Sequence, residues 1–195
     1  MELSQSLTSE ADLVHHARRG DQAAWEALVH AHQEPVFRLA YLLVGDAAEA
    51  EDIAQEAFIR AFLKLDRYDA GRPLRPWLLK IAANLAHNQR RAAGRYLAAV
   101  QRWFRSDPRV SAAPAELRGN RQMEAESLWQ AVRNLSDADQ RIIYLRFFLE
   151  LSVEETAEAM GIAQGTVKSR LHRALDRLRE VVRRDHPERG DWHEA

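Results

Sequence analysis

The stretch that decides the fold is Leu151–Arg179, with the sequence LSVEETAEAMGIAQGTVKSRLHRALDRLR. Its apolar residues recur at helical spacing over about 153–160 and again over about 164–184. Gly161 lies between these segments and tolerates the positive φ that commonly ends a helix. The stretch therefore predicts two helices joined by a tight turn.

The start of the first helix and the crossing of the two helices carry matching signals. Ser152 followed by Glu155 is a capping-box pattern, in which each side chain bonds the backbone amide of the other residue. Helices joined by a tight turn cross closely, and here Ala157 is small and Val167 is apolar at the expected crossing. This spacing resembles a DNA-binding helix-turn-helix, which we predict over residues 152–179.

The second helix separates an apolar stripe from a face suited to DNA. On a wheel of about 100° per residue, the apolar stripe is Val167, Leu171, Ala174, Leu175 and Leu178. The opposite face carries two hydroxyls and one guanidinium, which suit base edges in a major groove: Thr166, Ser169 and Arg173. The flanks carry cations suited to phosphates: Lys168, Arg170 and Arg177. Taken alone, this segment also fits an αα-hairpin with an exposed basic helix.

Upstream of this motif the chain is predicted to be helical throughout. No stretch alternates apolar and polar residues with the β-branched enrichment typical of strands. Helices are expected at about 10–19, 21–44, 47–65, 74–93, 122–134 and 137–149. Ser136 and Asp139 begin the last of these with a second capping-box-like pattern. Its apolar body is Ile142, Ile143, Leu145, Phe147, Phe148 and Leu151.

Two prolines separate the helices into two groups. Pro108 and Pro114 lie among small residues and arginines, where a helix cannot continue. We therefore predict an all-α protein of two small helical domains joined by a flexible linker. The predicted boundaries are residues 10–95 and 122–184 for the domains, 96–121 for the linker and 185–195 for a tail.

The predicted helix over residues 47–65 is amphipathic. Its apolar stripe is Ile53, Ala57, Phe58, Ala61, Phe62 and Leu65. Its outer face is mostly acidic and polar: Glu49, Asp52, Gln55, Glu56 and Arg60. Such a face either serves solubility alone or docks on a basic partner helix.

The predicted helix over residues 74–91 carries a polar stripe beside its core residues Trp77, Leu78, Ile81 and Leu85. The stripe aligns a cation, an amide, an imidazole and a second cation, with further charge from Arg90: Lys80, Asn84, His87 and Arg91. These groups suit a phosphate backbone with an occasional base contact. The polar loop Asp66–Pro73 precedes the helix and is expected to hold an unstacked base. In isolation the segment also fits a solvated helix edge beside a surface loop.

The net charge of −1 hides a strong polarity along the chain. Residues 1–56 hold 3 basic and 11 acidic side chains, whereas residues 57–121 hold 14 basic and 4 acidic ones. Residues 164–184 add a second basic cluster, with 7 basic and 2 acidic side chains. Two separate basic clusters indicate two contacts with a polyanion. The acidic front, residues 1–56, suits a protein partner.

Several function classes are disfavoured by composition. The chain has no cysteine, so disulfides and cysteine-ligated zinc are excluded. No apolar run approaches the ~18 residues of a membrane span, and no secretory signal pattern is present, so we expect a cytoplasmic protein without membrane insertion. His30 and His32 diverge on a helix and cannot chelate one metal from the same face. Without a phosphate-binding loop or HExxH motif, we predict no catalysis, no metal and no cofactor.

Three strings in series resemble the extracytoplasmic-function (ECF, group 4) sigma factors of the sigma-70 family, which are initiation subunits of bacterial RNA polymerase. The strings are AEDIAQEAFIRAF at Ala50–Phe62, PWLLKIAANLAHNQRR at Pro76–Arg91, and the helix-turn-helix stretch quoted above. Their order and spacing match across roughly residues 10–95 and 122–182. The resemblance implies two helical domains, sigma region 2 and sigma region 4, with no domain between them.

The resemblance also implies partners and roles. Region 2 would bind the β′ clamp helices of core RNA polymerase through Asp52, Gln55, Glu56 and Arg60. It would engage the −10 promoter element through Lys80, Asn84, His87, Arg90 and Arg91, with the preceding loop capturing a flipped base. Region 4 would read the −35 element through Thr166, Lys168, Ser169, Arg170, Arg173 and Arg177, and would touch the β flap. An anti-sigma protein is a candidate further partner.

A stand-alone transcriptional regulator is the rival interpretation. Such a protein would use the helix-turn-helix for DNA and the N-terminal helices for sensing or dimerisation. It would have no need of a second DNA-facing stripe in its N-terminal domain. Binding to core polymerase separates the two interpretations.

Overall fold

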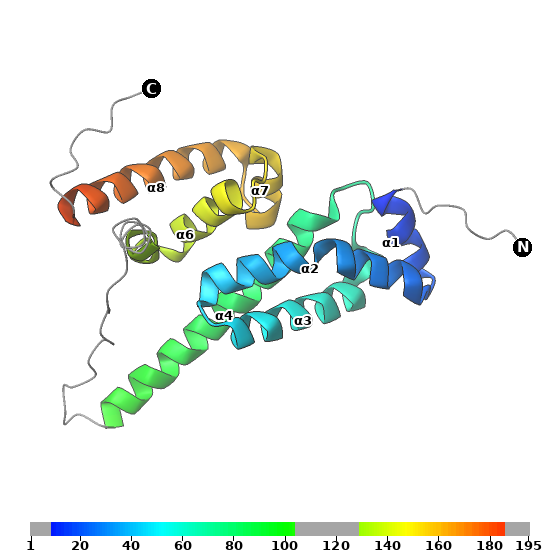
Figure 1. Cartoon of the computed structure of the whole chain (residues 1–195), viewed down its shortest axis with the longest axis horizontal. Coiled ribbons are helices and arrows are strands. Elements are labelled where there is room, and N and C mark those ends of the chain that lie inside the picture. The colour runs from blue at the N-terminus through cyan, green and yellow to red at the C-terminus, as the bar shows by residue number, and fades with distance from the viewer. Residues whose placement is uncertain (1–8, 104–128, 186–195) are drawn as a thin grey trace, which may run out of the picture.

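The computed structural model describes residues 9–103 and 129–185, and within these residues it contains helices and no strand (Figure 1). The N-terminal unit comprises α1 (Glu10–Arg18), α2 (Gln22–Val44), α3 (Ala47–Lys64), the 3₁₀ turn η1 (Leu65–Arg67) and α4 (Leu74–Trp103). The C-terminal unit comprises helical residues 129–133, α6 (Asp137–Ile143), the π-helical turn η2 (Tyr144–Phe148), α7 (Val153–Met160) and α8 (Gln164–Asp185). The all-α prediction is confirmed.

Local capping fixes where the N-terminal helices begin and end. Ser9, Asp21 and Asp46 are the N-caps of α1, α2 and α3, and each side chain accepts a hydrogen bond from the amide three residues later. This satisfies one of the amides that a helix leaves without an internal partner. Gly45 ends α2 with a φ of 82°, a left-handed conformation that favours glycine.

The N-terminal unit packs around α2, which contacts α1, α3 and α4. Its core is formed by side chains that are almost completely buried, including Val14, Leu28, Val36, Leu39, Ala57, Leu74, Leu78 and Leu79. Alanines fill the closest approaches, with Ala50, Ala61, Ala82 and Ala86 at 0% exposure. Small residues at these positions let the helices approach closely enough to bury the larger aliphatic chains.

Two aromatic residues depart from the predicted core. Phe62 was expected on the buried stripe of α3 but is 49% exposed, because the stripe there is occupied by Ala61 and Leu65. Phe147 was expected in the apolar body of the C-terminal unit but is 53% exposed. It lies in η2, where the Leu149 amide donates to the Tyr144 carbonyl five residues earlier. A π turn winds more slowly than an α-helix, so the α-helical wheel misplaces its side chains.

Helix α4 is longer than predicted: it was expected to end at about residue 93 and continues to Trp103. The alanine-rich sequence there favours a helix, and a single glycine inside it is tolerated at a cost of about 1 kcal/mol. Residues 96–103 of the predicted linker are therefore helical, and residues 104–121 lie outside the described residues, as does the predicted tail beyond Asp185.

The two units lie against each other along α4, whose closest partner in the C-terminal unit is α7 (Figure 1). Within the described residues no helix is long and apolar enough to cross a membrane. The contact with α4 matters for function, because α4 carries the stripe predicted to bind DNA.

Candidate nucleic-acid interface

The turn between α7 and α8 has the geometry that its sequence predicts. Ser152 and Glu155 form both hydrogen bonds of the capping box. The Glu155 amide donates to Ser152 Oγ at 3.1 Å, and the Ser152 amide donates to Glu155 Oε2 at 2.8 Å. Gly161 ends α7 with a φ of 67°. Ala157 and Val167 are 7% and 0% exposed where the helices meet. The helix-turn-helix is therefore held by local caps and a close-packed crossing.

The predicted −35 residues share the outer face of α8, away from buried Val167 and Ala174. Lys168, Ser169 and Arg173 are exposed, and Thr166 and Arg170 are half-buried. Within α8 the Arg173 Nε donates to the Ser169 carbonyl at 3.2 Å, which directs the guanidinium along the outer face. The α8 surface thus combines hydroxyls and cations in one row.

Arg177 has a partner that the sequence did not reveal. Its guanidinium is ion-paired with Asp139 of α6, whose side chain is only 4% exposed. Ser136 caps α6 by accepting from the Asp139 amide at 3.3 Å, but the Asp139 carboxylate turns to Arg177 instead of closing a capping box. Arg177 therefore ties α8 to α6 and balances a buried carboxylate.

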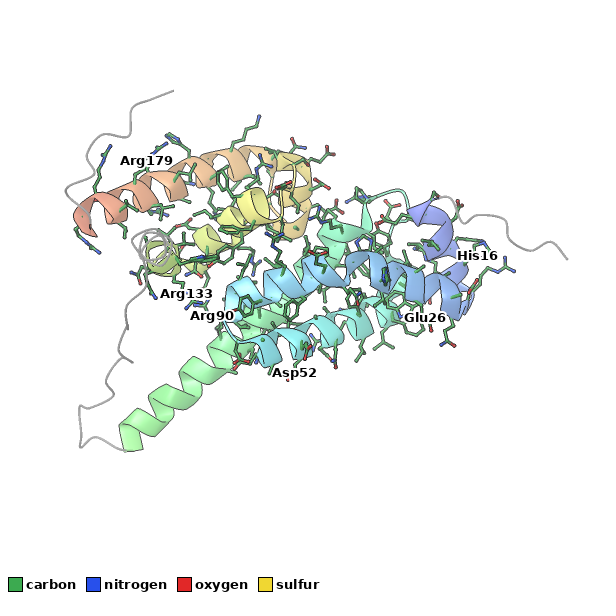
Figure 2. All side chains as sticks on the ribbon, in the orientation of Figure 1. His16, Glu26, Asp52, Arg90, Arg133 and Arg179 are labelled. Carbon is green, nitrogen blue, oxygen red and sulfur yellow. The ribbon has the colours of Figure 1, made fainter. Side chains whose placement is uncertain are left out.

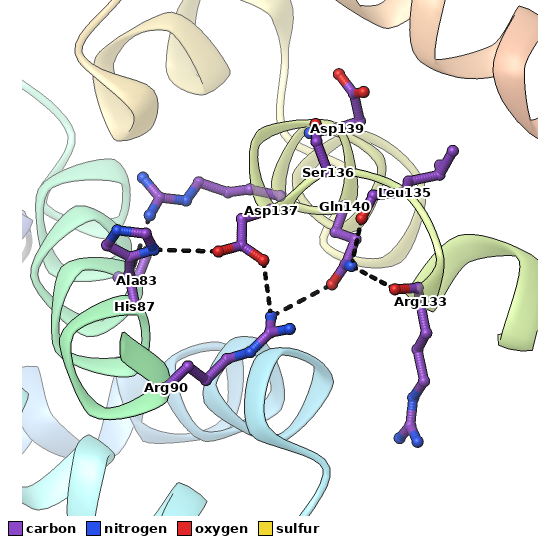
Figure 3. Close-up of polar contacts among 10 residues, drawn as sticks. Ala83, His87, Arg90, Arg133, Leu135, Ser136, Asp137, Asp139 and Gln140 are labelled. Atoms are coloured by element: carbon purple, nitrogen blue, oxygen red, sulfur yellow. Dashed lines mark hydrogen bonds and ion pairs between the residues drawn. The ribbon is translucent and has the colours of Figure 1, made fainter. Parts of the chain in front are cut away.

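The predicted −10 stripe runs along α4 beside the C-terminal unit. Asn84, Arg90 and Arg91 are exposed, whereas Lys80 and His87 are half-buried. The carboxylate of Asp137, at the start of α6, lies 3.3 Å from His87 Nδ1 and 3.2 Å from Arg90 Nη1 (Figure 3). The stripe is continuous, but part of it already faces an anion.

Buried side chains hold the backbone of the loop before α4, residues Asp66–Pro73, in place. Tyr68 is 7% exposed and packs against Trp77, with ring centroids 4.8 Å apart and ring planes tilted by 34°. Its hydroxyl donates to the Arg72 carbonyl. Arg18 of α1 donates to the Leu65 carbonyl at 2.9 Å and to the Tyr68 carbonyl. Burial raises the pKa of Tyr68, so its hydroxyl remains a donor across the physiological range. The loop backbone is thus fixed while Asp66, Arg67 and Asp69 stay exposed.

Glu10 joins three helices of the N-terminal unit. One carboxylate oxygen lies 2.8 Å from His32 Nε2, and the other accepts from the Leu74 amide at the start of α4 at 2.7 Å. The hydrogen bond from His32 is the largest cause of the lowered pKa of Glu10; burial opposes it, and the hydrogen bond from the Leu74 amide lowers the pKa further. The carboxylate form is therefore favoured in the folded state.

We expect Glu10→Gln to lower the free energy of unfolding at pH 7 by about 1 kcal/mol. The effect is small because the Glu10 side chain is 39% exposed and solvent screens its charge. A lowered pKa stabilises the fold above the ordinary value of 4.5, and this contribution is lost as the pH falls through the lowered pKa. Urea unfolding between pH 7 and about pH 3 should therefore show the difference from wild type shrinking. Glu26→Gln is the control, because Glu26 is exposed and its one hydrogen-bond partner among the described residues is Gln22. A difference that is constant with pH would contradict the assignment.

The outer face of α3 is acidic at one end and apolar at the other. Asp52 and Gln55 are exposed, and Glu56 accepts from Arg60 at 2.6 Å. Figure 2 shows Asp52 on the side of α3 that faces away from the C-terminal unit. The apolar part of this face was not predicted; it consists of Ile59 and Leu63, which are 55% and 75% exposed. Their spacing of seven and eleven residues from Asp52 was the available signal.

Comparison with known proteins identifies both units. The family model for sigma-70 region 2 matches residues 28–96, and the model for sigma-70 region 4 matches residues 125–178. The ECF RNA polymerase sigma factor SigW of Bacillus subtilis is 33% identical over 180 residues, covering 85% of this chain and 92% of that protein. The RNA polymerase sigma-H factor of Pseudomonas aeruginosa is also 33% identical, covering 90% of this chain and 96% of that protein.

The fold has the same relatives. The sigma factor RpoE of Bartonella quintana, solved in complex with the anti-sigma factor NepR, superposes with a TM-score of 0.61 at 28% identity. The match covers 83% of this chain and 98% of that one. A stand-alone regulator with a sensory domain is not favoured, because the N-terminal unit itself matches sigma region 2. The chain belongs to the extracytoplasmic-function sigma factors of the sigma-70 family, which direct RNA polymerase to promoters in transcription initiation.

Proposed function

We propose that this sigma factor divides promoter recognition between α4 and α8. The observation that carries the proposal is the presence of two cationic, hydroxyl- or amide-bearing faces on α4 and α8, one in each helical unit. In this scheme α4 contacts the −10 element through Lys80, Asn84, His87, Arg90 and Arg91. The α8 face reads the −35 element as duplex through Thr166, Lys168, Ser169, Arg170, Arg173 and Arg177.

The braced loop supports a role in promoter opening. Tyr68 and Arg18 hold its backbone, while its polar side chains stay exposed at the start of α4. A rigid polar loop beside a cationic helix suits an extruded base of the non-template strand, since capturing that base lowers the cost of opening the duplex. The chain supplies no reaction of its own in this scheme, because the polymerase performs the chemistry in the cytoplasm.

The outer face of α3 is the proposed contact with the β′ clamp helices of core polymerase. Its polar part is Asp52, Gln55, Glu56 and Arg60, and its apolar part is Ile59 and Leu63. An apolar centre beside charged groups is the usual composition of a protein interface. Region 4 is proposed to touch the β flap, and exposed Phe147 is a candidate for that contact. An anti-sigma protein, as in the complex of the Bartonella relative, is a further proposed partner.

Run-off transcription with purified core polymerase tests the function as a whole. The template is the DNA upstream of the gene that encodes the chain. We expect one discrete transcript that requires the chain, and co-elution of the chain with core polymerase. Absence of both would reject the proposal.

Replacing Arg173 by alanine should weaken binding of the reconstituted holoenzyme to the upstream duplex by roughly 5-fold to 150-fold, because a base contact of about 1–3 kcal/mol is lost. Fluorescence anisotropy of the labelled upstream DNA measures the change. Arg179→Ala is the matched control, because Arg179 is exposed on the same helix but pairs with Asp176. Equal losses for both variants would contradict a specific role for Arg173.

A further inference from the structure

Helix α1 lies outside the residues that the sigma-70 region 2 model matches, which begin at residue 28. It nevertheless packs into the N-terminal unit, where Val14 and Ala17 are 1% and 3% exposed. Figure 1 shows α1 beside the loop Asp66–Pro73 that leads into α4, and α1 contacts η1 at the start of this loop. The family match therefore leaves the role of α1 unassigned.

Arg18, in the last turn of α1, holds the first half of the loop. Its Nε donates to the Leu65 carbonyl at 2.9 Å, and its Nη2 donates to the Tyr68 carbonyl. These acceptors are 47 and 50 residues away along the chain. A guanidinium presents its donors in a rigid planar fork, so two carbonyls held by one fork keep a fixed spacing and orientation.

Glu10, in the first turn of α1, holds the other end of the loop. One carboxylate oxygen accepts from the amide of Leu74, the first residue of α4, at 2.7 Å, and the other lies 2.8 Å from His32 Nε2. The first amides of a helix lack an internal partner, and the helix dipole stabilises an anion beside them. His32 is 8% exposed on α2, so its contact fixes the direction of the carboxylate. Helix α1 therefore contacts both ends of the loop, one with each of its own ends.

Between these two anchors the loop is held by short-range contacts. The Arg72 amide donates to the Asp69 carbonyl and the Gly71 amide donates to Asp69 Oδ1, both at 3.0 Å. These hydrogen bonds shape the turn but connect only residues of the loop. The ring of Tyr68 packs against Trp77 of α4, and apolar contacts of this kind are non-directional. Directional contacts that place the turn relative to α4 are supplied by α1.

We propose that α1 is a positioning element for base capture, in which Arg18 and Glu10 hold the loop Asp66–Pro73 in the conformation that receives the extruded base of the −10 element. This inference rests on the proposed role of the loop in promoter opening. A site that already has its bound shape loses less conformational entropy on binding, and a loop free to move would lose that advantage. Removing the Arg18 contacts should therefore reduce the affinity for the extruded base and slow promoter opening. Binding to core polymerase and to the upstream duplex should stay unchanged, because neither proposed surface includes α1.

The test measures how strongly the reconstituted holoenzyme holds each base of the −10 region. The probe is a fluorescein-labelled single strand of about 12 nucleotides with the non-template sequence of that region, located from the mapped start of the run-off transcript. Each nucleotide in turn is replaced by an abasic one, and fluorescence anisotropy gives the loss of affinity. We expect wild type to lose about tenfold at one position, where the loop holds the base, and less at the others.

Arg18→Met removes both donors and keeps a long side chain at the same place. We expect it to reduce the abasic penalty at that one position to less than about threefold and to leave the other penalties unchanged. Promoter opening, followed by the fluorescence of 2-aminopurine in the −10 element, should slow about fivefold. Arg19→Met is the matched control, because it removes the same charge from the next residue, which is exposed. This control should behave as wild type in both assays.

Glu10→Ala is an independent second variant, because it frees the Leu74 amide and leaves the Arg18 contacts in place. It should reduce the abasic penalty at the same position. Melting curves establish the temperature below which every variant is folded, and binding is measured below it. A role of α1 in stability alone would lower the Tm of the variants and leave the pattern of abasic penalties as in wild type.

The outcomes separate this inference from the proposed function. If wild type has no position with a distinct penalty, the loop does not hold a base, and its proposed role in opening is rejected together with this inference. If wild type has such a position but Arg18→Met and Glu10→Ala keep its full penalty, α1 is not a positioning element, and the proposed function stands. If Arg18→Met and Arg19→Met weaken binding equally at all positions, the positive charge and not the placement of the loop is the cause, and this inference is rejected.

Discussion

Replacing Leu39 by alanine should lower the free energy of unfolding by about 2–5 kcal/mol, the cost of removing a large side chain from a closed core. Leu39 is 0% exposed on α2, the helix that contacts α1, α3 and α4. The cavity left behind would lie at the centre of the N-terminal unit, where the surrounding helices cannot move inward to fill it. Domains of this size are stabilised by only about 5–15 kcal/mol, so the loss would be a large fraction of the total.

Urea unfolding followed by circular dichroism measures this effect, with the midpoint expected to fall at an unchanged slope. Leu63→Ala is the matched control, because Leu63 is 75% exposed on α3 and loses little contact on truncation. Its effect should stay within about 0.5 kcal/mol. Similar losses for the two variants would contradict the assignment of Leu39 to the core.

The features that were predictable from the sequence are those fixed by neighbouring residues. The capping box of Ser152 and Glu155, the left-handed Gly161 and the crossing at Val167 all depend on contacts within a few residues or on one helical turn. Their geometry follows from backbone hydrogen-bonding rules that hold in any protein. For this reason the helix-turn-helix is predictable without knowledge of any tertiary contact.

The predicted burial of side chains is wrong where the helical period changes and where no neighbouring helix covers an apolar face. Phe147 was misplaced because η2 is a π turn, and no short sequence pattern announces such a turn. Phe62 was predicted to be buried but is exposed, because apolar character alone does not tell whether a partner helix covers a side chain. Only the packing of α2 and α4 decides which apolar face of α3 becomes the core.

Contacts between distant residues were not predictable at all. Glu10 accepts from the Leu74 amide across 64 residues, and Asp137 meets His87 and Arg90 across the boundary between the two units. A single sequence contains no signal that pairs such positions. The stripe on α4 was predictable as a row of cations, but its opposing carboxylate follows only from the way the units pack.

The second large effect is expected at the outer face of α3. Asp52→Arg should weaken binding to core RNA polymerase by at least about 10-fold, because reversing a charge at a complementary interface places like charges together at a cost of several kcal/mol. Asp52 is exposed and lies on the face of α3 opposite the buried Ala57 and Ala61. The fold should therefore keep its stability, and the loss should be confined to binding.

The dissociation constant of the chain for core polymerase is measured by surface plasmon resonance with immobilised polymerase, at low and at physiological salt. Wild-type association should slow as salt rises, since exposed charges are screened beyond about 8–10 Å, and the variant should lose most of this dependence. Glu51→Arg is the matched control, because it makes the same charge reversal on the same helix but about 100° around its axis. We expect Glu51→Arg to change the affinity by less than about threefold, since Glu51 is not among the residues of the proposed contact. Equal weakening by both variants would show that only the net charge of the acidic front matters, and it would remove Asp52 from the proposed contact with the clamp helices.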